Sequence, residues 1–162
     1  MRFEFATAGR IVFGPGAVAE LPAAARGLGT RALVVTGRDE DRWAAHFDAL
    51  SAYGLTCATY AVPGEPTLDL VRAGVERVRE HRADLVVAIG GGSAIDAGNA
   101  IAALATNPGD ALDYLEVVGK GQPLAAAPLA VIAVPTTAGT GAEVTRNAVL
   151  GVPEQRVKVS LR

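Results

Sequence analysis

Apolar residues in this chain fall into short continuous runs that alternate with stretches of helical spacing. Three runs are almost wholly apolar and stop at a glycine or a proline, at residues 31–36, 84–89 and 129–134. Such runs are typical of strands that are buried on both faces of a parallel sheet. A further strand is expected at residues 55–62, where apolar and β-branched residues again gather.

The segments between these runs have the spacing of helices. In residues 68–81, leucine and valine recur every three or four positions and form one apolar stripe. Helices are also expected at residues 17–26, 41–52 and about 93–105. Strands that alternate with helices of this length predict an α/β fold, a doubly wound parallel sheet like a Rossmann dinucleotide-binding domain.

The first residues predict a small element in front of this sheet. Residues 3–6 and 10–13 read as two short strands joined by a turn at Gly9, so we expect an N-terminal β-hairpin. Residues 3–6 are short and apolar. As an edge strand they would invite pairing with another chain.

The composition fits one domain and excludes several functions. The chain has 162 residues, of which 50% are hydrophobic and 20% charged, so it can bury a core and is too apolar for disorder. A net charge of -2 gives no basic surface for nucleic acid or an anionic membrane. No apolar run approaches the ~20 residues that span a bilayer, and no signal peptide is evident. Because Cys57 is the single cysteine, no internal disulfide can form, and we predict a cytoplasmic protein.

The strongest chemical signal is the glycine loop, residues 90–93, which lies between a predicted strand and a predicted helix. Three glycines let the backbone approach a ligand, and the first N–H groups of the helix have no partner within it. We therefore expect Gly91, Gly92 and Ser93 to lie against a pyrophosphate. The alternative is a tight turn with a capped helix, because Ser93 and Asp96 have the spacing of a capping box. Asp96 could otherwise bind a ribose or a carboxamide further along a cofactor.

A second signal is the threonine loop, residues 135–145, which follows the next apolar strand. Thr136, Thr137 and Thr140 supply hydroxyls that can donate to a ribose or phosphate, beside two glycines. The alternative is a hydroxyl-stabilised turn with another capping box, formed by Thr140 and Glu143. If both loops follow parallel strands, they line one crevice at the carboxyl edge of the sheet, where α/β proteins bind ligands.

Together these two loops resemble a known family. GGGSAIDAGNAIA at residues 90–102, PTTAGTGAEVT at residues 135–145 and FGPGAVAEL at residues 13–21 resemble the iron-containing (group III) alcohol dehydrogenases. The resemblance covers essentially the whole chain. It implies an NAD(P)-dependent oxidoreductase that interconverts a small alcohol and an aldehyde or ketone by hydride transfer.

The resemblance also implies which half of such an enzyme is present. Residues 1–162 correspond to the NAD(P)-binding domain, whereas a C-terminal helical domain would hold a divalent metal, iron or zinc, through aspartate and histidine. No metal site is expected here, because His46 and His81 lie apart from other ligand-type residues. On its own the chain is expected to bind a dinucleotide weakly and not to turn over substrate. Family members commonly dimerise, so we also predict a homodimer.

Individual positions carry over from the family pattern. Gly91, Gly92 and Ser93 match its pyrophosphate loop, and the three threonines match its second cofactor loop. Val149 and Lys158 match residues near the two riboses, although Lys158 could equally be an exposed strand charge. At the end of the first sheet strand, Gly37 and Arg38 would accommodate a 2′-phosphate, which favours NADP slightly over NAD. Asp39, two residues after Gly37, could argue the opposite case, and a further alternative is that Arg38 and Asp39 form a solvated loop pair.

Two positions depart from the family pattern, and other assignments stay open. Asn99 stands where the family usually has lysine, and Glu65 stands where many members have asparagine. A maleylacetate reductase, a glycerol dehydrogenase or a dehydroquinate-synthase-like enzyme would share this fold. A non-catalytic nucleotide-binding module or fragment is the alternative from a different class of protein.

Overall fold

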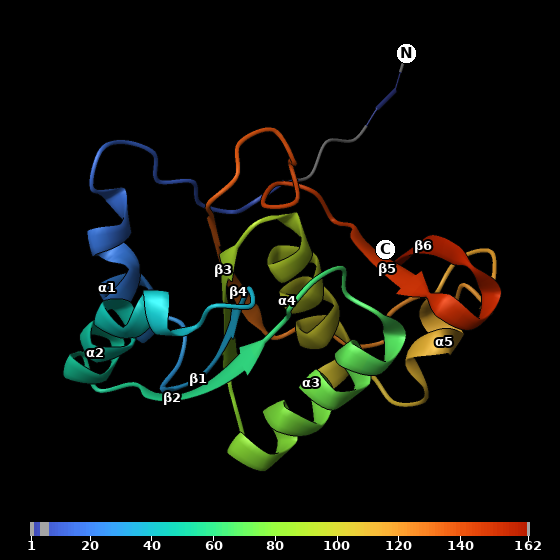
Figure 1. The fold of residues 1–162 in the computed structure, drawn as a ribbon, viewed down its shortest axis with the longest axis horizontal. Coiled ribbons are helices and arrows are strands. Elements are labelled where there is room, and N and C mark those ends of the chain that lie inside the picture. The colour runs from blue at the N-terminus through green and yellow to red at the C-terminus, as the bar shows by residue number, and fades with distance from the viewer. Residues whose placement is uncertain (1, 4–6, 162) are drawn as a thin grey trace.

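The computed structural model describes residues 2–3 and 7–161 and contains a four-stranded parallel sheet (Figure 1). The strand order is β2-β1-β3-β4, so the chain builds outward in both directions from the central pair β1 and β3. The predicted doubly wound α/β fold is confirmed. The strands are β1 (Arg31–Thr36), β2 (Thr56–Ala61), β3 (Leu85–Gly90) and β4 (Ala130–Pro135).

Helices cover both faces of this sheet. One face packs on α1 and α2, and the other packs on α3 and α4, as Figure 1 shows to the left and right of the strands. Alternate residues of β1 and β3 point to the two cores, which explains why both strands are apolar throughout. The helices are α1 (Leu21–Arg26), α2 (Ala44–Ala52), α3 (Leu68–His81), α4 (Gly92–Ala105) and α5 (Ala111–Tyr114), with 3₁₀ turns at Ala17–Glu20, Asp41–Trp43 and Pro153–Gln155.

Glycines let α4 and its neighbours approach closely. Gly98 of α4 faces Ala88 of β3, and a Cβ atom added to Gly98 would lie 2.7 Å from the Cβ of Ala88. Gly74 of α3 faces the side chain of Ile101 on α4, where an added Cβ would also collide. The position of α4 on the sheet therefore depends on two residues without side chains.

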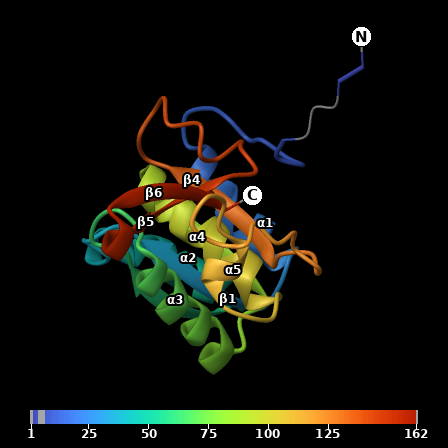
Figure 2. The same cartoon turned by 90° about the vertical axis from the view of Figure 1, so that its right-hand side faces the viewer.

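A separate antiparallel hairpin, β5 (Ala148–Val152) and β6 (Val157–Leu161), packs beside α4. Figure 2 shows it in front of α4, on the side away from α1 and α2. The backbone N–H of Gly151 donates to the carbonyl of Pro66 over 2.8 Å, which ties the hairpin to the loop after β2.

The structure describes only part of the predicted N-terminal hairpin, and that part contains no strand. Residues 10–13 form no strand, and Ile11 and Phe13 are 64% and 100% exposed, because neither lies against the sheet or a helix. Most of the other predicted strand, residues 4–6, lies outside the described residues. Two short strands without a packed face are too few for stability, which explains the irregular chain at residues 10–13.

Two predicted helices begin later than the sequence suggests. The segment 17–26 starts as a 3₁₀ turn and becomes α-helical at Leu21, with Pro22 in the first α-helical turn. The segment 41–52 likewise starts as a 3₁₀ turn and becomes α-helical at Ala44. Proline is tolerated in the first turn because it lacks an N–H to donate to the preceding turn. In the described part of the chain, no helix combines the length and apolar character needed to cross a membrane.

Candidate functional site

The carboxyl ends of β1, β3 and β4 meet at one edge of the sheet. Gly37 follows β1 and lies against the glycine loop, since a Cβ added to Gly90 would be 3.6 Å from the nitrogen of Gly37. The threonine loop follows β4, and the N–H of Thr136 donates to the carbonyl of Gly90 over 2.9 Å. Because the strand order reverses between β1 and β3, this edge is the crevice where open α/β sheets bind ligands.

The glycine loop leads directly into the N-terminus of α4. Gly91 is the N-cap with extended backbone, and its carbonyl accepts hydrogen bonds from Ala94 and Ile95. No side chain in the described residues caps this end. The predicted capping box of Ser93 and Asp96 is therefore wrong, because Gly91, two residues earlier, takes the N-cap position. The N–H groups of the first turn carry the positive end of the helix dipole and can serve an anion.

The threonine loop lies beside this N-terminus, above the sheet in Figure 1. A Cβ added to Gly91 would lie 3.2 Å from Thr137 Oγ1, and one added to Gly92 would lie 3.4 Å from Thr140 Cγ2. Thr136, Thr137 and Thr140 are all exposed. The structure thus brings both predicted loops to the same edge and leaves the threonine side chains open to solvent.

The second predicted capping box, formed by Thr140 and Glu143, is also wrong. Residues 136–147 contain turns and bends but no helix that could be capped. Gly139 and Gly141 have φ values of 93° and 70°, so the chain reverses at these glycines instead of entering a helix. This conformation keeps the loop folded over the start of α4.

Asp96 does not cap the N-terminus of α4 but contacts the hairpin. Its half-buried carboxylate accepts a hydrogen bond from the backbone N–H of Val149 on β5. Burial raises the pKa of Asp96, and the Val149 hydrogen bond opposes that increase. The carboxylate therefore joins α4 to β5, beside one of the two positions expected near a ribose.

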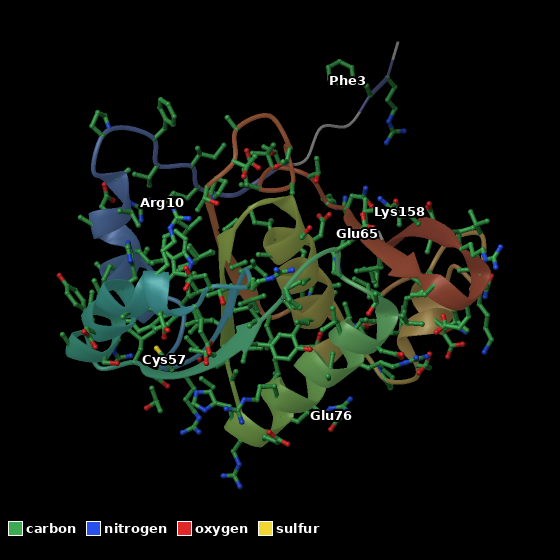
Figure 3. All side chains as sticks on the ribbon, in the orientation of Figure 1. Phe3, Arg10, Cys57, Glu65, Glu76 and Lys158 are labelled. Atoms are coloured by element: carbon green, nitrogen blue, oxygen red, sulfur yellow. The ribbon has the colours of Figure 1, made fainter. Side chains whose placement is uncertain are left out.

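Lys158 lies on β6 of the hairpin and is paired. Its Nζ is 2.5 Å from Oε1 of Glu65, which comes from the loop between β2 and α3. Figure 3 shows the two labelled side chains meeting between that loop and the hairpin. A shallow groove beside the pair is lined by Thr67, Gly151 and Arg156. Sequence reasoning did not identify the pairing of Glu65, because the two residues are far apart in the chain.

Arg38 leaves the end of β1 toward the same loop. Its guanidinium donates to the carbonyl of Pro63 over 3.2 Å, so it is not paired with Asp39 in the way that a solvated loop pair would be. A Cβ added to Gly37 would meet no atom within 4 Å, which leaves open space beside the end of the strand.

The described residues do not fit a divalent metal. Among them, no three histidine, cysteine, aspartate or glutamate side chains come together in a way that could hold an ion. His46 contacts the edge of Trp43, and Nε2 of His81 lies 3.0 Å from the carbonyl of Thr56.

Comparison with known proteins decides the family. The model of the family described as iron-containing alcohol dehydrogenase matches residues 8–162. The chain belongs to the iron-containing alcohol dehydrogenase family. The solved 1,3-propanediol oxidoreductase, a structural relative, aligns with a TM-score of 0.89 and 31% identity, over 99% of this chain and 42% of that one. Sulfoacetaldehyde reductase from Bifidobacterium kashiwanohense, solved with NAD+, aligns with a TM-score of 0.84 and 32% identity, over 99% and 43%.

The curated relatives that the chain matches are also much longer than the chain itself. It is 34% identical over 159 residues to the mitochondrial hydroxyacid-oxoacid transhydrogenase of Caenorhabditis elegans, which covers 93% of this chain and 34% of the relative. It is 39% identical over 104 residues to the 4-hydroxybutyrate dehydrogenase of Cupriavidus necator, over 64% and 27%. The chain therefore spans about a third of these iron-containing alcohol dehydrogenase relatives.

Proposed function

We propose that this chain is the dinucleotide-binding part of an NAD(P)-dependent iron-containing alcohol dehydrogenase. The observation that carries the proposal is the glycine loop at the uncapped N-terminus of α4, with the threonine loop beside it. An uncapped helix N-terminus with glycines attracts an anionic group, and here it lies at the point where the strand order reverses. The names of the relatives, dehydrogenases and a transhydrogenase, support oxidoreductase chemistry.

The residues of the site suit the separate parts of such a cofactor. The N–H groups of Gly91, Gly92 and Ser93 would hold the pyrophosphate, because a side chain at either glycine would occupy the space between the loops. Hydroxyls of Thr136, Thr137 and Thr140 would donate to phosphate or ribose oxygens. In this assignment backbone N–H groups and neutral hydroxyls hold the phosphates, so no positively charged side chain is required.

The remaining assignments concern the riboses. Val149 and Lys158 would lie near them, with Asp96 behind Val149. Gly37 and Arg38 would lie at the adenosine end, where open space beside Gly37 suits a 2′-phosphate and motivates a slight preference for NADP.

When bound, the nicotinamide supplies or accepts the hydride in the interconversion of an alcohol and a carbonyl. The residues of this chain bind and orient the dinucleotide, and they hold its two halves along the carboxyl edge of the sheet. A polarising group for the carbonyl oxygen would come from outside the described residues. We therefore expect binding without turnover from the isolated chain.

Isothermal titration calorimetry with NADPH and NADH tests this proposal. We expect saturable binding of both, with Kd values no weaker than about 1 mM, and somewhat tighter binding of NADPH. An alcohol-oxidation assay on the same sample should show no activity. Absence of any heat with millimolar cofactor would overturn the binding site, and measurable oxidation would overturn the predicted inactivity.

We further propose a homodimer formed through the N-terminal segment. Of the expected contact strand, residues 3–6, the structure describes Phe3, which is 81% exposed, and this is unusual for a large apolar side chain. Removing residues 1–9 should convert dimers to monomers in size-exclusion chromatography with light scattering. A monomeric chain of residues 1–162, or a shortened chain that stays dimeric, would contradict this assignment. A cytoplasmic location remains a prediction.

A further inference from the structure

The β5–β6 hairpin buries one face and turns the other face outward. Leu150 and Val159 are buried in the core that α3 and α4 share. Because side chains alternate along a strand, Gly151 and Lys158 lie on the opposite, outward face. They are also direct partners across the two strands, so Lys158 stands beside a position that has no side chain.

Loop 62–67, which joins β2 to α3, meets the hairpin at this glycine. One edge of β5 pairs with β6, and at the other edge the N–H of Gly151 donates to the carbonyl of Pro66. Glu65, the residue before Pro66, nevertheless reaches β6, where its Oε1 lies 2.5 Å from Nζ of Lys158 (Figure 3). Glu65, Gly151 and Lys158 line one groove of about 210 Å³. The glutamate side chain therefore crosses β5 at its glycine.

The Glu65–Lys158 pair lies at the same edge of the sheet as the glycine and threonine loops. The four strands of the sheet are parallel, and loop 62–67 follows the carboxyl end of β2. The guanidinium of Arg38, just after β1, donates to the carbonyl of Pro63 in the same loop. A cation held by this loop stands at the edge where open α/β sheets bind their ligands.

We propose that Glu65 is a positioning residue for Lys158, and that the missing side chain at Gly151 makes their contact possible. A lysine without a partner samples many rotamers, so a bound ligand would have to fix it at a cost in entropy. Pairing with Glu65 fixes the ammonium group before the ligand arrives. The effect on affinity rests on the proposed dinucleotide function, whereas the attachment of the hairpin to loop 62–67 does not.

Glu65→Gln tests the attachment directly. The reporter is the amide of Gly151, because its hydrogen bond to Pro66 joins the same two segments. The side chains of Lys158 and Glu65 are 62% and 52% exposed, and ion pairs of this kind contribute little. We therefore expect hydrogen exchange of the Gly151 amide to become about 3-fold faster, and the Kd for NADH to rise about 3-fold.

Three further variants separate the ion pair from a general change in charge. Glu154→Gln removes a carboxylate from the hairpin turn without altering the groove lining, so it should change neither measurement. Lys158→Met should speed exchange as much as Glu65→Gln, and combining the two should add nothing further. Glu65→Lys together with Lys158→Glu should restore slow exchange of the Gly151 amide. NADH affinity should stay low in that double variant, because a carboxylate replaces the cation on β6.

Gly151→Val tests the passage across β5. An added Cβ would have its nearest neighbour, the carbonyl oxygen of Pro66, at 3.7 Å, and valine is favoured in strands, so the hairpin should accept the change. The larger side chain would stand between Glu65 and Lys158. In the Gly151→Val background, Glu65→Gln should therefore alter neither amide exchange at position 151 nor the Kd for NADH.

The outcomes distinguish this proposal from the proposed function. Unchanged exchange of the Gly151 amide in Glu65→Gln overturns the attachment, whatever happens to binding. Faster exchange with unaltered or tighter NADH binding overturns the positioning role, since Glu65 would then be irrelevant to the lysine's contact or would mask its charge. Faster exchange in a chain that binds no NADH before or after the change supports the attachment, and the dinucleotide site itself then fails.

Discussion

Gly92→Asp is expected to abolish dinucleotide binding while leaving the fold intact. Gly92 is the first residue of α4, where a carboxylate interacts favourably with the helix dipole, so the helix itself should not be destabilised. The same carboxylate would stand where we place the pyrophosphate. Two like charges within a few ångströms in a partly desolvated crevice should weaken binding at least ~100-fold, which corresponds to roughly 3 kcal/mol.

Gly92→Ala is the matched control for this experiment. It introduces the same Cβ atom, 3.4 Å from Cγ2 of Thr140, but no charge. Calorimetry should show a modest loss of NADH affinity for alanine and no detectable binding for aspartate, with both melting temperatures close to the original. Equal losses in the two variants would mean that the crevice is blocked by bulk, and unaltered binding by aspartate would remove the phosphate site from the end of α4.

The central part of the fold could be predicted from sequence because its strands are buried on both faces. The apolar run 31–36 coincides with β1, and the run 84–89 differs from β3 by one residue at each end. Glycine and proline mark where these runs stop, and they also mark the loops of the candidate site. Burial on both faces makes these strands apolar throughout, so their ends can be recognised in the sequence. The candidate site lies at those ends.

Features that depend on tertiary contacts could not be predicted in this way. The spacing of Ser93 and Asp96 suits a capping box, but Gly91 takes the N-cap position and the carboxylate of Asp96 turns to Val149. The pairing of Glu65 with Lys158 joins a loop to a strand that is remote in sequence. Local spacing also predicted a hairpin at the N-terminus, whereas the observed one is β5 and β6, where α4 supplies a surface to pack on.

Gly98→Val is expected to cause a large loss of stability. Gly98 lies where α4 crosses β3, and an added Cβ would be only 2.7 Å from the Cβ of Ala88, an atom that cannot rotate away. Helix and sheet must separate, and overpacking of this kind costs about 3 kcal/mol. The melting temperature should fall by roughly 10 °C for a chain of this size, as measured by calorimetry.

Replacing Gly98 and Ala88 together distinguishes crowding between α4 and β3 from a loss of stability within the helix itself. Gly98→Ala alone should be destabilising, and so should Ala88→Gly, which removes a packed methyl group and loosens the strand. The double variant restores one Cβ between α4 and β3, so it should be more stable than Gly98→Ala alone. It should also recover NADH affinity, because α4 carries Gly92 and Ser93 to the crevice and its distance from the sheet sets their position. Additive losses in the double variant would contradict this view and would locate the defect within α4.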